Sequence, residues 1–244
     1  MSHSEYELII KNYLLKHGFE LFKPKAVLFD MDGVLYDSMP NHAVAWQESM
    51  GKFGIAMTRE DAYATEGQRG IDTIRQKVEQ QQGRQITEEE AQTMYEVKSR
   101  LFHMMPEAPV MPGILSLMAQ ISEAGIKVGV VTGSGQRPLI KRLLKDFGSY
   151  LSEDHIVTAY DVKRGKPNAE PYEKGLSKLG GLAPYEAIVV ENAPLGVQAG
   201  VAARIFTIAV NTGILPDSIL EEKGANLVLA SMPILSNKWK MLIS

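Results

Sequence analysis

The chain has 244 residues, enough for one α/β domain and a small second one, and its 45% hydrophobic and 23% charged residues are typical of a soluble globular protein. A formal net charge of −3 gives no electrostatic reason to expect nucleic acid or an anionic membrane as a partner. The absence of cysteine excludes disulfide bonds, a thiolate nucleophile and cysteine zinc sites.

The N-terminal stretch predicts a helix and no targeting signal. Within residues 4–18, apolar side chains recur at intervals of three and four, which predicts an amphipathic helix that ends at Gly18. Charged residues interrupt this stretch, unlike a signal peptide, and no apolar run in the chain approaches the roughly 18 residues of a membrane span. We therefore expect residues 1–22 to be a helical extension packed on the core of a cytoplasmic monomer.

A short buried strand and an acidic turn follow. Residues 26–29 are apolar, and the run breaks at Asp30 and Gly33, as expected for a strand that is buried on both faces and ends in a turn. Asp30 and Asp32 lie two apart at the strand end, so both carboxylates can face one ligand-binding space. The pair suggests a metal-dependent nucleophile and acid/base pair, although such a tetrapeptide is also found in ordinary polar turns.

Residues 40–106 show helical patterns without an intervening strand. A helix is expected from Pro40 to about residue 54, and Thr-x-x-acid capping patterns begin two others, at Thr58 and Thr87. Between these lie a polar segment, the 65–70 loop, and a helix to about residue 82; the last helix runs to about residue 105. An all-helical block between strand-containing regions predicts an inserted cap domain, residues 39–107.

From Gly113 onward, helical and strand patterns alternate, which predicts βαβ units and a parallel sheet. The fold class expected is thus α/β, a Rossmann-like core formed by residues 23–38 and 108–244 with the helical cap inserted. The expected helices are 113–124, 136–147, 169–179, 194–203 and 216–222, and the expected strands are 127–132, 155–158, 187–190, 205–210 and 226–229.

Polar groups at the ends of four predicted strands form an ordered set. Any one of them is uninformative, since a lone lysine is usually solvated and a lone threonine often caps a strand. Together they resemble the four motifs of the haloacid dehalogenase superfamily, and the cap position resembles its β-phosphoglucomutase-like branch. The resemblance covers residues 24–242. The set comprises Asp30 and Asp32, Thr132 with Gly133 and Ser134, Lys166, and Glu191 with Asn192.

The resemblance implies phosphoryl transfer through an aspartyl-phosphate. Asp30 would attack phosphorus, and Asp32 would protonate the leaving oxygen and later deprotonate the incoming nucleophile. A Mg²⁺ cofactor would be held by the Asp30 carboxylate, the Asp32 carbonyl and Asn192, in keeping with its preference for oxygen ligands.

Further residues of the set would bind the phosphoryl group of a small phosphorylated substrate. The resemblance implies that Thr132 and the main-chain amides near Gly133 and Ser134 hydrogen-bond its oxygens. Lys166 would neutralise charge on the phosphate and on Asp30.

Two positions depart from the branch pattern. Asn192 replaces the commoner Asp, which removes one negative charge at the implied metal and makes Glu191 a further candidate ligand. Arg204 stands where the branch usually has a small residue, often Gly, between helix and strand. Because positive φ would strain an arginine, we expect a different turn there.

The expected cap contributes further candidates. By resemblance, His42 lies near the hinge and Lys98 points into the cleft, although a core-satisfied His and a solvated Lys are the ordinary alternatives. We expect hinges near residues 38–40 and 107–112, where both junctions contain proline.

The 65–70 loop bears on the substrate. In mutase members of the branch, a Gly is followed three positions later by an Arg that grips the distal phosphate of a sugar bisphosphate. Counting from Gly67, that position is Gly70, while Arg69 is one residue out of step and Glu66 precedes the glycine. The loop looks like that of pyrophosphate-hydrolysing members, in which Glu66 would reach the Mg²⁺; an exposed turn glutamate is the alternative.

We therefore expect a Mg²⁺-dependent phosphohydrolase that acts on a small phosphate such as pyrophosphate, with β-phosphoglucomutase as the alternative. A nicotinamide-dependent dehydrogenase is a remote alternative, suggested by the Gly-Ser-Gly at 133–135. It lacks the third glycine of the dinucleotide motif, since Pro138 stands there. A non-catalytic binding module on the same fold would require loss of the motif residues, which are present.

Overall fold

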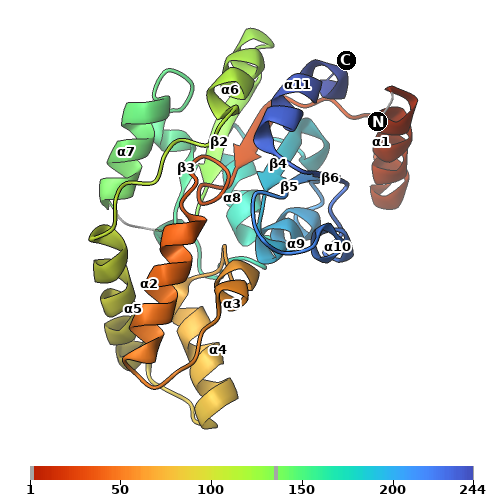
Figure 1. The fold of residues 1–244 in the computed structure, drawn as a ribbon. Helices are drawn as coiled ribbons and strands as arrows, with labels where there is room; N and C mark the ends of the chain where they lie inside the picture. The colour runs from red at the N-terminus through yellow and green to blue at the C-terminus, as the bar shows by residue number, and fades with distance from the viewer. Residues whose placement is uncertain (1–2, 135–136, 244) are drawn as a thin grey trace.

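The computed structural model describes residues 3–134 and 137–243. The expected start of a helix at 136 and the glycine at 135 in the dinucleotide-like motif lie outside the described residues. Six parallel strands form one sheet in the order β3-β2-β1-β4-β5-β6 (Figure 1). The strands are β1 Ala26–Phe29, β2 Lys127–Val131, β3 Ile156–Val157, β4 Ala187–Glu191, β5 Phe206–Val210 and β6 Leu227–Leu229.

Helices cover both faces of this sheet, and four more lie beyond the carboxyl ends of its strands (Figure 1). The α-helices are α1 His3–His17, α2 Met39–Gly51, α3 Arg59–Ala64, α4 Gly70–Gln82, α5 Glu88–His103, α6 Ile114–Glu123, α7 Arg137–Phe147, α8 Glu170–Lys178, α9 Pro194–Ala202, α10 Asp217–Glu222 and α11 Met232–Ile243. Three short 3₁₀ turns are η1 Glu153–His155, η2 Ala159–Asp161 and η3 Pro184–Glu186.

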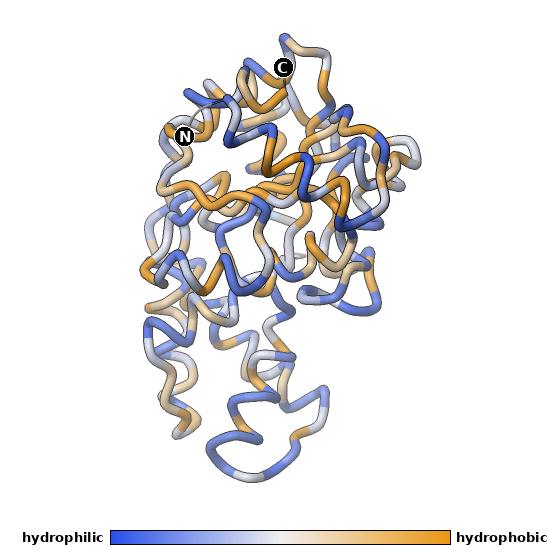
Figure 2. Tube along the Cα trace, turned by 90° about the vertical axis from the view of Figure 1, so that its right-hand side faces the viewer, coloured by the Kyte–Doolittle hydropathy of each residue, from blue (hydrophilic) through white to orange (hydrophobic). Residues whose placement is uncertain are grey.

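The two faces of the sheet bury alternate residues of each strand. Val27 and Phe29 of β1 pack with α6, α7, α11 and α1, whereas Ala26 and Leu28 pack with α8 and α9. All four residues are fully buried, which explains why the strand sequence is continuously apolar. Figure 2 shows hydrophobic segments running through the middle of the part of the molecule that contains the sheet.

The helices α2 to α5, which we call the helical insertion, have a hydrophobic cluster of their own, with Trp46, Met50, Ile74 and Met94 among its buried members. Both predicted capping boxes are formed, and their Thr side chains accept from the main-chain N–H of Asp61 and Glu90. No strand occurs between β1 and β2, so the all-helical character of residues 39–107 agrees with the sequence pattern.

The predicted α/β fold class is confirmed, and every predicted strand is present within two residues of its expected ends. One helix was not predicted. α11 has Pro233 in its first turn and buries Leu235, Trp239 and Leu242, a spacing of four and three that follows the last strand directly. It packs on α6 and completes the cover of that face.

The expectation of a different turn at Arg204 is wrong, because this residue has φ 62° in the left-handed region. Such a conformation costs about 1–2 kcal/mol for a residue with a Cβ. Local contacts hold it: Tyr13 Oη donates to the Arg204 carbonyl at 2.9 Å, and the guanidinium lies 4.7 Å from the Phe19 ring and donates to the His17 carbonyl. Arg204 therefore ties α1 to the core.

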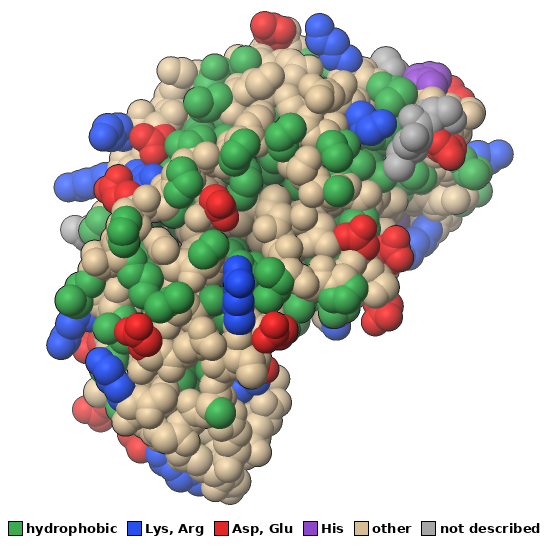
Figure 3. All heavy atoms as spheres, in the orientation of Figure 1, with side chains coloured by type: hydrophobic (Ala, Val, Ile, Leu, Met, Phe, Trp, Pro, Cys, Tyr) green, Lys and Arg blue, Asp and Glu red, His purple; other side chains and the backbone are tan. Residues whose placement is uncertain are grey.

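The surface carries mixed charges. On the face shown in Figure 3, basic and acidic side chains are interspersed among hydrophobic ones. Among the helices of residues 3–134 and 137–243, none combines the length and apolarity needed to cross a membrane.

Candidate active site

The site lies where the order of strands along the sheet reverses. β1 pairs with β2 on one side and with β4 on the other. The strands that follow β1 in sequence are therefore added first on one side of it and then on the other. In open parallel sheets, ligands bind beyond the carboxyl ends of the strands at this position. Asp30 follows β1, Thr132 follows β2, and Glu191 and Asn192 stand at the end of β4, which brings the predicted strand-end groups together.

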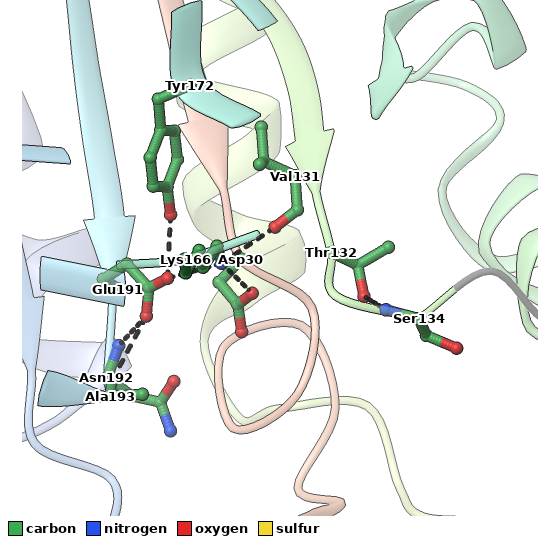
Figure 4. Close-up of polar contacts among 9 residues, drawn as sticks. All are labelled: Asp30, Val131, Thr132, Ser134, Lys166, Tyr172, Glu191, Asn192 and Ala193. Carbon is green, nitrogen blue, oxygen red and sulfur yellow. Dashed lines mark hydrogen bonds and ion pairs between the residues drawn. The ribbon is translucent and has the colours of Figure 1, made fainter. Parts of the chain in front are cut away.

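Lys166 connects two of these groups, Asp30 and Glu191 (Figure 4). Its ammonium donates to Asp30 Oδ1 at 2.5 Å, to Glu191 Oε1 at 2.6 Å and to the Val131 carbonyl at 3.0 Å, so each N–H has an acceptor. Burial alone would lower the pKa of Lys166, but the two carboxylates raise it above its usual value. Burial raises the pKa of Asp30 to about 7, against the opposing effect of Lys166.

Glu191 is fully buried, and both its oxygens have protein donors. Oε1 accepts from Lys166 and from the Tyr172 hydroxyl at 2.8 Å, while Oε2 accepts from the main-chain N–H of Asn192 at 3.0 Å and of Ala193 at 3.2 Å. A carboxylate with these partners is suited to holding Lys166. This favours a positioning role over the metal-ligand role expected for Glu191 from the sequence.

Asp32 is held by a chain of side chains that extends into the helical insertion. Ser38 Oγ donates to Asp32 Oδ1 at 2.6 Å, and His42 Nε2 lies 3.1 Å from the same oxygen. Lys98 Nζ lies 2.7 Å from His42 Nδ1. Because an ammonium can only donate, Nδ1 accepts, and the ring proton of neutral His42 is on Nε2 facing Asp32.

The charges of this chain follow from its surroundings. Burial would raise the pKa of Asp32, but His42 and Ser38 hold it at about 2. Burial, together with the nearby Lys98 charge, lowers the pKa of His42. Lys98 lies 5.1 Å from the Trp46 ring and 5.0 Å from the Phe102 ring, and burial lowers its pKa to about 8.

The 65–70 loop reaches the core. A Cβ built on Gly133 would lie 2.9 Å from the Gly67 carbonyl oxygen, and one built on Gly67 would lie 3.2 Å from Lys166 Cδ. Glu66 thereby enters the site: burial, followed by the charges of Asp32 and Asp30, raises its pKa to about 8. The exposed-turn alternative for Glu66 does not describe this arrangement.

Several of these groups line one small pocket of about 40 Å³, which we call the site cavity. Tyr95 closes one side, and its ring packs so tightly on Gly70 that a Cβ there would lie 2.2 Å from a ring carbon. Arg69 is not among the lining residues; it forms a two-point ion pair with Asp72 at 2.8 and 3.1 Å. The predicted residues that line the cavity are Asp30, Asp32, His42, Glu66, Lys98, Thr132, Gly133 and Ser134.

Main-chain hydrogen bonds fix the segment after β2. The Ser134 N–H donates to Thr132 Oγ1 at 3.0 Å (Figure 4). The Thr132 N–H donates to the Val157 carbonyl at 2.9 Å. The hydroxyl of Thr132 is therefore fixed at the cavity wall, with Gly133 leaving room for the 65–70 loop.

The donor set suits Mg²⁺. Among the described residues, four buried side-chain polar atoms lack a hydrogen-bond partner, and one of these is Asn192 Oδ1 at the sheet edge beside Asp30. An amide oxygen without a donor, at the same end of the sheet as the Asp30 carboxylate, is the kind of ligand that a hard divalent cation takes. The Asn192 side chain can pack against the turn after β1 because residue 33 is glycine: a Cβ there would lie 2.1 Å from Asn192 Nδ2.

Several contributing residues were not predicted. Ser38, Tyr95 and Tyr172 contact Asp32, Gly70 and Glu191, respectively. Tyr95 lies three residues before Lys98 on the same helix face, so helical spacing from a predicted site lysine could have indicated it. Tyr172 had no comparable signal, because its partner is nineteen residues away in sequence.

Comparisons with known proteins agree with this geometry. A family model described as haloacid dehalogenase-like hydrolase matches residues 27–210. Hexitol phosphatase A of Escherichia coli (strain K12) is 36% identical over 77% of this chain and 83% of its own length. Validoxylamine A 7'-phosphate phosphatase of Streptomyces hygroscopicus subsp. limoneus is 30% identical over 77% of this chain and 86% of its own length.

A solved structure from Bacteroides vulgatus, provisionally described as a beta-phosphoglucomutase, has a TM-score of 0.95 and 49% identity. The alignment covers 99% of this chain and 98% of that one. None of these comparisons supports the remote dehydrogenase alternative.

Proposed function

The chain belongs to the haloacid dehalogenase-like hydrolases and is an enzyme of the phosphohydrolase class, and from that premise we propose that it is a Mg²⁺-dependent phosphohydrolase whose preferred substrate is inorganic pyrophosphate. The observation that carries the proposal is the size and lining of the site cavity. About 10–15 Å³ holds one water, so about 40 Å³ suits a compact anion, whereas a sugar bisphosphate would require the surrounding groups to move apart.

The lining also argues against the mutase alternative. A mutase of this branch would use an Arg of the loop to grip the distal phosphate, but Arg69 is paired with Asp72 and does not line the cavity. Glu66 occupies that side instead. A carboxylate facing two phosphate groups is repulsive unless a cation lies between them, which is the arrangement we propose for a bound magnesium pyrophosphate.

The proposed reaction uses the residues of the core. Asp30 Oδ2 attacks phosphorus, a bond to phosphorus forms, and the bond from phosphorus to the leaving phosphate oxygen breaks. Asp32, oriented by Ser38 and His42, then removes a proton from the water that hydrolyses the aspartyl-phosphate. Phosphate is released and the Asp30 carboxylate is regenerated.

Binding and charge compensation involve both parts of the molecule. Lys166 holds Asp30 Oδ1 and leaves the other carboxylate oxygen for attack, while the Thr132 hydroxyl, which accepts from the Ser134 N–H, donates to a phosphoryl oxygen. Mg²⁺ would be held by Asp30, the Asp32 carbonyl, Asn192 and Glu66, and would offset negative charge on the substrate. Lys98 would contact the leaving phosphate from the helical insertion, which acts as a mobile cap.

The experiment is a comparison of substrates with one enzyme preparation. We expect phosphate release from pyrophosphate to exceed that from hexitol and glycerol phosphates by at least about tenfold in kcat/KM, a free-energy difference of about 1.4 kcal/mol. Conversion of β-glucose 1-phosphate to glucose 6-phosphate is measured in parallel. Mutase turnover above hydrolysis, or a phosphomonoester preferred over pyrophosphate, would contradict the proposal.

A pair of variants tests the cavity argument. Tyr95→Ala removes the ring that packs on Gly70 and should raise the ratio of phosphomonoester to pyrophosphate hydrolysis, because the cavity becomes larger. Tyr95→Phe keeps the ring and serves as the matched control. Equal ratios in wild type and both variants would show that the ring does not limit substrate size.

A further inference from the structure

Arg69 is prominent in the 65–70 loop but has no place in the proposed chemistry. Its guanidinium is held by Asp72 on its own helix, which leaves the aliphatic stem to face the core. That stem lies over Gly165: a Cβ built on Gly165 would be 3.0 Å from Arg69 Cγ and 3.5 Å from the Arg69 main-chain nitrogen. Gly165 directly precedes the site residue Lys166.

The backbone at Gly165 does not require glycine. Its φ lies outside the left-handed region, as does that of Gly133, so an alanine could adopt either conformation. At both positions the close neighbours of an added Cβ belong to the 65–70 loop, namely Gly67 and Gln68 at Gly133 and Arg69 at Gly165. Because Gly133 and Gly165 have no side chains, the 65–70 loop can pack directly on their backbone. We call these two glycines the seat of the loop.

The seat lies close to the reacting groups. Gly67 has φ 90° and turns its Cα face toward the stem of Lys166, at 3.2 Å for a built Cβ. Glu66 precedes Gly67 and lines the site cavity with Asp30 and Asp32. A displacement of the loop by a few tenths of an ångström would therefore move Glu66 relative to Asp30.

We propose that Gly165 and the stem of Arg69 are positioning residues whose contact seats the 65–70 loop on the core and sets how far Glu66 enters the site cavity. The inference rests on the proposed function, because it assigns Glu66 a role in hydrolysis. It gives the out-of-step Arg69 a docking role in place of a phosphate grip.

The test is a double-mutant cycle on the full chain, with pyrophosphate as substrate. Gly165→Ala should lower kcat/KM about tenfold, since misplacement by about 1 Å can cost about a hundredfold and this shift is smaller. Arg69→Ala should cost less, because it loses the contact of the stem with Gly165 without pushing the loop away from the core. Gly165→Ala combined with Arg69→Ala should recover to within about threefold of Arg69→Ala alone, since the added methyl group then has space.

Three controls separate positioning from folding. Gly51→Ala, where a built Cβ meets nothing within 4 Å, should leave kcat/KM unchanged. Acetyl phosphate, a small activated acyl phosphate whose leaving group needs little assistance, should be hydrolysed by Gly165→Ala within about threefold of wild type. Thermal unfolding midpoints should be alike for all variants, and hydrogen exchange of the 65–70 loop should be faster in Gly165→Ala than in the double variant.

The inference would be overturned if the fold-losses in kcat/KM of the two single variants multiply in the double variant. Full activity of Gly165→Ala would also overturn it. An equal loss on acetyl phosphate would also overturn it, since the core would then be damaged. If wild type prefers another small phosphate over pyrophosphate, the proposed substrate fails while the cycle is measured with that phosphate, and recovery in the double variant still supports the seat.

Discussion

The two halves of the site each contain a buried lysine, and the two lysines differ in their partners. Lys166 in the core and Lys98 in the helical insertion are 3% and 4% exposed, so burial alone does not distinguish them. Lys166 has two carboxylates and a carbonyl as acceptors, and its pKa is raised. Lys98 has one imidazole nitrogen and two aromatic faces, and its pKa is lowered to about 8.

The difference indicates how the work is divided. In the core, the buried charged groups have protein hydrogen-bond partners before any substrate binds: Lys166 donates to Asp30 and Glu191, and Ser38 donates to Asp32. In the insertion, no ion pair joins Lys98 to a carboxylate of the described residues. Burial, followed by the charges of Asp32 and Asp30, raises the pKa of Glu66. A magnesium-bound anion would supply opposite charge on that side, so we expect substrate binding and closure of the insertion to favour each other.

The largest effect is expected for the nucleophile of the core. Asp30→Asn should lower turnover by about a thousandfold or more, because the amide keeps the shape but lacks the attacking charge. Turnover and the thermal unfolding midpoint are measured under saturating Mg²⁺. Activity within about tenfold of wild type would contradict an aspartyl-phosphate mechanism.

Replacement of the two lysines by methionine should have opposite effects on stability. Lys166→Met leaves Asp30 and Glu191 together without their cation and should lower the free energy of unfolding by about 3–5 kcal/mol. Lys98→Met removes a poorly compensated charge and should leave that free energy unchanged or raise it, while pyrophosphate hydrolysis falls. Denaturant unfolding at pH 7 gives both values, and equal destabilisation by the two changes would remove the distinction.

A smaller effect should follow the loss of one hydrogen bond to Glu191. Tyr172→Phe keeps the ring beneath Lys166 but removes the hydroxyl that donates to Glu191 Oε1. We expect a loss of about 1–3 kcal/mol in the free energy of unfolding, the cost of a missing partner for a buried group. The free energy of unfolding of both proteins is measured by denaturant unfolding, and equal values would contradict this role of the hydroxyl.

The smallest effect concerns pH. Because the pKa of Lys98 is lower in the folded state than its ordinary 10.5, the unfolded chain binds more protons between about pH 8 and 10.5. The contribution of Lys98 to stability therefore rises with pH through this window, and its full penalty is present below about pH 8. The difference in unfolding free energy between wild type and Lys98→Met should shrink over the same range, and a constant difference would contradict the shift.

The residues that could be predicted lie at strand ends or helix starts. Asp30, Thr132 and Asn192 follow buried strands, so strand prediction places them at one sheet edge without knowledge of the packing. Lys166 lies in a loop and could be placed only through the resemblance to a family.

The features that were missed depend on contacts between distant segments. Tyr95 closes the site cavity because its ring meets Gly70, and Gly165 matters because the stem of Arg69 lies on it. Arg204 adopts positive φ because α1 supplies partners from the far end of the chain. A local sequence pattern carries no information about such distant partners. The rule that positive φ strains an arginine is local, and at Arg204 the contacts with α1 outweigh it.

The core groups have protein partners, whereas the charged groups of the insertion are poorly compensated. This contrast predicts a selective effect of Glu66→Gln. The change keeps the side-chain shape, removes the negative charge and leaves every residue of the core in place. We expect kcat/KM for pyrophosphate to fall about a hundredfold or more while that for acetyl phosphate falls less than about tenfold, because only the former needs the insertion side. Equal losses on the two substrates, or an unchanged rate with pyrophosphate, would contradict the account.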